Sequence, residues 1–92
     1  MSFLKRLFGS GGGAGGPRFD PVEHEGYTIV PEPMPEGGQY RLQAVIRKSL
    51  DGVEREHRLI RADLFPDAEQ AAQFAIVKAR QVIAEQGDRM FA

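Results

Sequence analysis

The sequence predicts an α+β protein in which a three-stranded antiparallel sheet packs against one long C-terminal helix, with a short separate amphipathic segment at the N-terminus. Three observations lead to this prediction. The middle of the chain alternates apolar and polar residues with the period of a strand. The last third repeats apolar residues at helical spacing. A glycine-rich stretch separates both from the first eight residues.

Length and composition limit the classes of protein to consider. With 92 residues the chain has room for one domain, and its 41% hydrophobic and 27% charged residues are typical of a folded globular protein. The absence of cysteine excludes disulfides, thiolate catalysis and cysteine-based metal sites. No apolar run approaches the ~20 residues that span a bilayer, and no signal peptide is evident. The sequence therefore predicts a cytoplasmic protein.

The chain divides into three parts. Residues 1–8 form the amphipathic segment, residues 9–20 a flexible linker, and residues 21–92 the single α+β domain. Six of the eight residues from Gly9 to Gly16 are glycine, which is entropically costly to order and offers no side chain to pack.

The first predicted strand is Tyr27–Val30, which is aromatic and β-branched. Prolines at positions 31, 33 and 35 follow it, so we expect a short strand near an edge of the sheet, because proline cannot donate to a strand ladder. Gly37 and Gly38 then turn the chain into the second strand.

A β-hairpin is predicted around Asp51 and Gly52, two residues that tolerate positive φ. A two-residue loop pairs Leu50 with Val53. The register stays open, because this pairing turns His57 and Arg61 toward the core, and a slip of one residue would reverse the face of the third strand. The further pairs that follow are Arg47–Glu56, Ile46–His57, Ala44–Leu59 and Leu42–Arg61. One face then holds Tyr40, Leu42, Ala44, Ile46 and Leu59, and the other holds Arg41, Gln43, Val45, Arg47, Glu56, Arg58 and Ile60.

The long helix begins after Asp67, whose carboxylate can accept hydrogen bonds from the first backbone N–H groups, and ends at Gly87. Its apolar residues cover one side and are expected to pack on the sheet. They are Ala68, Ala71, Ala72, Phe74, Ala75, Ile76, Ala79, Val82 and Ile83.

The amphipathic segment has an apolar arc made of Phe3, Leu4, Leu7 and Phe8, with Lys5 and Arg6 opposite. Eight residues are too few for a stable helix in water, where ~12–15 are needed. We therefore expect this segment to fold only against a surface, either a membrane or a partner protein. The alternatives are docking on its own domain and simple disorder.

Positive charge gathers in the predicted hairpin. Residues 19–38 carry five acidic and no basic groups, whereas residues 39–61 carry six basic and three acidic groups. Phosphate contact needs such a basic cluster, and a two-stranded ribbon can enter the major groove of DNA. The candidate nucleic-acid-binding residues are Arg41, Arg47, Lys48, Arg55 and Arg58. The alternative is a solvated strand face with cross-strand ion pairs.

Several fragments together resemble the HlyU family, small proteobacterial proteins described as transcriptional activators. The fragments are 1–9, 29–34, 37–42, 59–63 and 87–91. The resemblance covers essentially the whole chain outside the glycine linker. It implies a bacterial regulator that acts on DNA or on a DNA-bound partner.

The leading hypothesis is therefore a transcriptional regulator that binds duplex DNA, or a DNA-bound regulator, through the basic hairpin. The alternative is an adaptor that attaches to a membrane or protein through residues 1–8, and self-association stays open in both cases. No nucleophile with a base, no acid pair in a pocket and no metal-ligand spacing is evident, so we predict neither an enzyme nor a cofactor.

Overall fold

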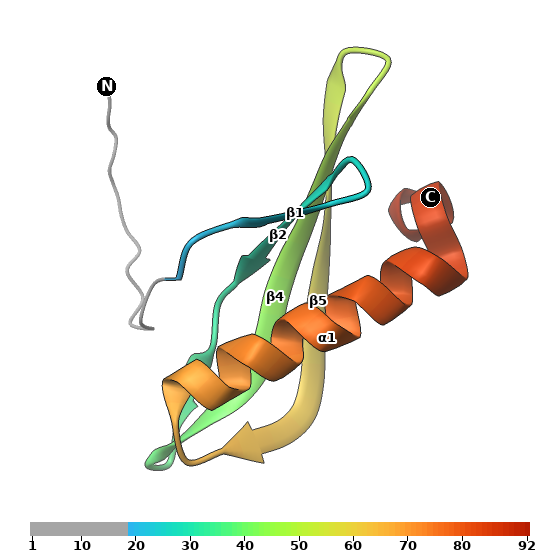
Figure 1. The fold of residues 1–92 in the computed structure, drawn as a ribbon. Coiled ribbons are helices and arrows are strands. Elements are labelled where there is room, and N and C mark those ends of the chain that lie inside the picture. Colours follow the sequence, from blue (N-terminus) through green and yellow to red (C-terminus); the bar gives the residue numbers. More distant parts are fainter. Residues whose placement is uncertain (1–18) are drawn as a thin grey trace.

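A single long helix covers one face of an antiparallel sheet in the computed structural model, which describes residues 19–92 (Figure 1). The elements follow the order β1 (Val22–His24), β2 (Tyr27–Pro31), β3 (Met34–Glu36), β4 (Gln39–Leu50), β5 (Val53–Phe65), α1 (Ala68–Gln86) and the 3₁₀ helix η2 (Gly87–Phe91). The predicted amphipathic segment and most of the predicted linker lie outside the described residues. The α+β class and the long C-terminal helix are confirmed.

The prediction of three strands is wrong, because the sheet has five. No pattern of residues predicts β1, whose three residues include Glu23 and His24. This strand forms by pairing with β2 through a two-residue turn, in which Glu25 has φ 51° and Gly26 has φ 86°. Glutamate seldom adopts positive φ, so the turn was not recognised in the sequence.

The other additional strand, β3, continues the line of β2. Both pair with β4 in one unbroken register, from Thr28↔Arg47 to Glu36↔Gln39. The prolines thus interrupt a strand that resumes after them, since Pro33 has no N–H to donate. The expected edge position of the first strand is also wrong, because β2 lies between β1 and β4.

The hairpin of β4 and β5 is confirmed. Asp51 and Gly52 both have positive φ, and the pairs Leu50↔Val53, Arg47↔Glu56 and Ala44↔Leu59 are those predicted. The predicted Leu42–Arg61 pair is wrong. A bulge places three residues of β5, 61–63, opposite Leu42 alone, and pairing resumes at Arg41↔Leu64. Because the bulge adds two residues, the faces beyond it are unchanged.

The helix α1 begins and ends where the sequence predicts. The Asp67 carboxylate accepts a hydrogen bond of 3.1 Å from the Glu69 N–H, and Gly87 follows the last turn with φ 55°. Alanines on the sheet-facing side let the helix approach β4 and β2 closely. Among the described residues, no helix is long and apolar enough to cross a membrane.

The core lies between α1 and the inner, helix-covered face of the sheet. Ile29, Leu42 and Ile46 are fully buried there against the helix alanines. Phe74 was expected in this core, but its side chain is 45% exposed and stacks on Phe65 with ring centroids 5.1 Å apart. The predicted apolar stripe was too wide, because Phe74 lies at its margin beside the end of β5.

Substitutions in the core and at the margin of the apolar stripe should therefore differ in their effect on the free energy of unfolding. Replacing Ile46 with alanine is expected to cost about 2–5 kcal/mol, because the buried side chain leaves a cavity between the sheet and the helix. Replacing the exposed Phe74 with alanine should reduce the free energy of unfolding by less than half as much. Urea unfolding of both variants measures the two losses, and equal losses would contradict the assigned core.

Candidate nucleic-acid interface

Three of the candidate basic residues lie on the outer face of the sheet, which α1 leaves uncovered. Arg41 and Arg47 project from β4 on this face, and Arg58 projects from β5 opposite Val45. Their shared face is the one that the hairpin register predicts. At about 3.3 Å per residue, the positions from Arg41 to Arg47 span roughly 20 Å along the strand.

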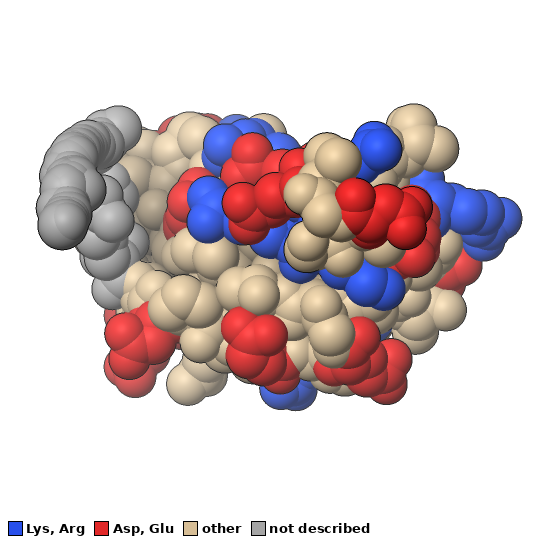
Figure 2. Space-filling model, turned by 90° about the horizontal axis from the view of Figure 1, so that it is seen from above, with Lys and Arg blue, Asp and Glu red and all other residues tan. Residues whose placement is uncertain are grey.

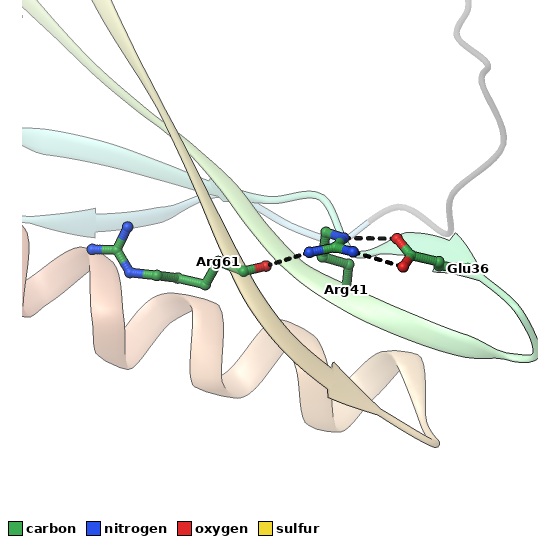
Figure 3. A network of polar contacts seen from close by, with 3 residues as sticks. All are labelled: Glu36, Arg41 and Arg61. Atoms are coloured by element: carbon green, nitrogen blue, oxygen red, sulfur yellow. Dashed lines mark hydrogen bonds and ion pairs between the residues drawn. The ribbon is translucent and has the colours of Figure 1, made fainter.

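Arg41 is held most firmly of the three. Its Nε and Nη2 donate hydrogen bonds of 2.7 and 2.6 Å to the two carboxylate oxygens of Glu36, and its Nη1 donates to the backbone oxygen of Arg61 at 3.3 Å (Figure 3). The Arg61 side chain points away from this group. The hydrogen bonds with Arg41 lower the pKa of Glu36 below its usual value, and those with Glu36 raise the pKa of Arg41.

The other two arginines also form ion pairs. Arg47 contacts Glu56 across the hairpin at 3.1 Å, and Arg58 contacts Glu32 at 3.3 Å. Glu32 follows β2 on the far side of β4, so the Arg58–Glu32 pair passes over β4. Below it lie Val45 and Gln43, which are buried although no helix within residues 19–92 covers this face. The aliphatic part of the arginine thus shields the outer face from water.

The end of the hairpin is a two-stranded ribbon. Pairing between β2 and β4 ends at Thr28↔Arg47, whereas β4 and β5 stay paired to Leu50↔Val53. This end projects past α1 in Figure 1. Seen from above, Lys and Arg side chains are interspersed with Asp and Glu side chains, without one uniform positive patch (Figure 2).

Lys48 and Arg55 lie opposite each other on the inner face, away from the three arginines. Arg55 is exposed, and it forms no ion pair within residues 19–92. The Lys48 ammonium is 3.1 Å from Asp88 Oδ1 and 4.4 Å from the centre of the Tyr27 ring. The structure thus separates Lys48 from the outer-face arginines.

Asp88 joins η2 to the sheet. The Tyr27 hydroxyl donates a 2.5 Å hydrogen bond to the Asp88 oxygen that also accepts from Lys48, and the Tyr27 ring stacks on Phe91. Hydrogen bonds from Tyr27 and then Lys48 lower the pKa of Asp88. The bond with Asp88 raises the pKa of Tyr27, with burial of the ring adding to the rise, and it raises the pKa of Lys48.

Sequence reasoning found Glu56 opposite Arg47 but missed the acidic partners of Arg41 and Arg58. Glu32 and Glu36 belong to the acidic block and meet arginines from the basic block only after the sheet forms. The opposite charges of the two blocks are the one signal in the sequence that points to these pairs. Gln43 was also missed: it is buried on the outer face, and its Oε1 has no hydrogen-bond partner among the described residues.

The fold and the site define a class of protein. It is a two-layer α+β domain in which one helix covers the inner face of the sheet and arginines project from the outer face. In the described part of the chain, no group of three or more His, Cys, Asp or Glu residues could hold a metal ion. Residues 2–91 match the family described as "Transcriptional activator HlyU", and the chain belongs to this family. It is thus placed in a family of transcriptional regulators rather than in an enzyme class. No curated protein and no solved structure matches the chain.

The contact that anchors η2 should depend on pH. Because the pKa of Asp88 is lowered in the folded protein, its contribution to stability is present above the ordinary value of 3.8 and is lost as the pH falls through the lowered value. The pKa values of Tyr27 and Lys48 are raised in the folded protein. Their contribution to stability is therefore present below the ordinary values of 10.0 and 10.5, and it is lost as the pH rises through the raised values.

The comparison of wild type with Asp88→Asn isolates this effect. We expect a melting temperature difference that is constant near neutral pH and shrinks at both extremes. Glu54→Gln, at an exposed carboxylate, serves as the control and should show a small difference throughout. A difference between wild type and Asp88→Asn that persists unchanged at pH 2 would contradict the assignment.

Proposed function

We propose that this protein regulates transcription by contacting duplex DNA with the outer face of strands β4 and β5. The observation that carries the proposal is the position of Arg41, Arg47 and Arg58 on the sheet face that the helix leaves uncovered. Membership of a family described as transcriptional activators supports it. No helix-turn-helix is present in residues 19–92, so the uncovered outer face of the sheet, from Arg47 at the base of the two-stranded end back to Arg41, is the basic surface that we assign to DNA phosphates.

The spacing of the three arginines suits a nucleic-acid backbone. A span of roughly 20 Å corresponds to about six base pairs at 3.4 Å each. Guanidinium groups match phosphate geometry better than ammonium groups do. We assign phosphate contact to these three arginines and assign Lys48 to holding Asp88, and we leave out Arg55 because it lies on the inner face.

The ion pairs on this face do not prevent DNA binding. Arg58 and Glu32 are 51% and 40% exposed, and exposed pairs of this kind contribute ~0–1 kcal/mol each. A phosphate that replaces the carboxylate therefore meets little resistance, while the release of counterions from DNA favours the exchange. The glutamates limit affinity and hold the arginines in position when DNA is absent.

Removing charge from the two sides of these pairs should have opposite effects on DNA binding. Arg47→Ala with Arg58→Ala should weaken binding and lower the slope of log affinity against log salt by about 2, because two phosphate contacts are lost. Glu32→Gln with Glu56→Gln should strengthen binding, because the same two arginines lose their competitors. Fluorescence anisotropy with duplex DNA at two salt concentrations measures both.

Arg80→Ala is the matched control, since Arg80 is exposed on α1, away from the ribbon. It should leave the affinity nearly unchanged. Binding that survives the double arginine variant would refute this interface. If the wild type does not bind DNA at low salt, direct contact is excluded, and docking of the same face on a DNA-bound regulator becomes the better hypothesis.

The second candidate function is an adaptor, favoured by the apolar arc of Phe3, Leu4, Leu7 and Phe8 in the sequence. We propose that residues 1–8 bind a membrane surface or a partner protein. On anionic lipid the arc would bury its side chains while Lys5 and Arg6 stay at the head groups. The two basic groups add only ~1 kcal/mol each to this attraction.

Co-sedimentation with anionic vesicles tests the adaptor. We expect the wild type to sediment and to gain helical circular dichroism, and a variant with Leu4→Glu and Leu7→Glu to do neither. DNA binding should be equal in the two proteins. A wild type that stays in the supernatant would exclude the membrane form of this hypothesis.

A further inference from the structure

The strand β5 has an open edge. It pairs with β4 along one side, and nothing within residues 19–92 pairs with its other side. The strand is 13 residues long, and α1 packs mainly on β4 and β2. An unpaired edge of this length offers a row of backbone donors and acceptors to another strand.

Apolar side chains flank the second half of this edge on both faces of the sheet. Ile60 and Leu64 are 47% and 39% exposed on the outer face. On the inner side, Phe74 stacks on Phe65 near the end of β5, and Val77 is exposed one turn further along α1. Large apolar groups gathered around an open edge are typical of a surface that becomes buried in an assembly.

The sequence at this edge is complementary to the same sequence in a second copy of the chain when the two strands run antiparallel. When Ile60–Leu64 is placed antiparallel to a second copy with a two-fold axis at Ala62, Ile60 lies opposite Leu64 of the second copy. Arg61 then lies opposite Asp63 of the second copy, and the two Ala62 residues meet. Residues directly opposite in an antiparallel pair share a face, so apolar meets apolar and positive meets negative.

The bulge makes these residues available. Residues 61–63 together face Leu42 alone, so the regular pairing of these residues with β4 is interrupted. Neither Arg61 nor Asp63 takes part in an ion pair within the described part of the chain. The backbone oxygen of Arg61 is held by Arg41 while its side chain points away from that contact (Figure 3).

We propose that a second copy of this chain pairs its β5 antiparallel to this edge, about a two-fold axis at Ala62, which makes one continuous sheet through both copies. The symmetry makes every contact occur twice, as in a closed dimer. Two Arg61–Asp63 pairs between the copies flank the axis. The α1 helices stay on one side of the joined sheet, and the outer-face arginines of both copies stay on the other.

Charge exchange tests the register as well as the dimer. Sedimentation equilibrium of the full chain without DNA, over a wide range of concentration, should show a reversible dimer. Arg61→Asp places two acids opposite each other, and Asp63→Arg places two bases opposite each other. Each variant alone should raise the dissociation constant about tenfold, because both symmetry-related pairs change from attraction to repulsion.

Mixing the two variants supplies the matched control within the experiment. One chain then carries acids at both positions and the other carries bases, so the mixture should form a heterodimer with an affinity near that of the wild type. The chain with both substitutions should also dimerise, because its pairs are restored in reverse. Arg80→Asp makes the same charge change as Arg61→Asp on α1 and should leave the dimer intact.

If the wild type stays monomeric at every concentration, the proposal is overturned. The bulge is then explained as a feature that prevents edge pairing. A dimer that survives both single variants, or that the mixture fails to restore, overturns it as well. Because mass is measured without DNA, none of these results depends on whether the ribbon binds DNA.

Discussion

The structure depends on β4, whose residues from Leu42 to Ile46 are buried on both faces although the helix covers only one. On the inner face, Leu42, Ala44 and Ile46 pack against the alanines of α1. On the outer face the described part of the chain supplies no second layer, and the ion pair between Arg58 and Glu32 passes over the strand instead. A two-layer domain of this size must screen one sheet face with its own long side chains. The arginines proposed to bind DNA therefore also have a structural task.

Features set by neighbouring residues could be predicted from the sequence. The turn at Asp51 and Gly52 predicted the pairs that the structure has up to Gln43↔Ile60, and Asp67 and Gly87 marked the ends of the helix. Features that depend on distant residues could not. The strand β1 exists because β2 lies beside it, and the bulge left the alternation of faces unchanged, so no pattern in the sequence signalled either.

The candidate site shows the same division. The shared face of Arg41, Arg47 and Arg58 followed from strand alternation, which is local. Their partners Glu36 and Glu32 did not. Glu36 is only five residues from Arg41, but it lies on β3, a strand that was not predicted, and Glu32 is 26 residues from Arg58. The hydrogen bond between Tyr27 and Asp88 joins residues 61 positions apart in the chain. Asp88 also accepts from Lys48, so Lys48, which was predicted in the interface, instead helps to hold η2. Charge counts located the basic block correctly, but only the fold shows which charges are already paired.

The central claim is that the outer-face arginines leave their glutamate partners for DNA phosphates. Nuclear magnetic resonance of the arginine Nε–H groups during a titration with duplex DNA at low salt tests it most directly. The account predicts that the signals of Arg41, Arg47 and Arg58 shift together, while those of Arg80 and Arg89 stay in place. Shifts confined to arginines of α1 and η2, or no shift at all, would contradict it.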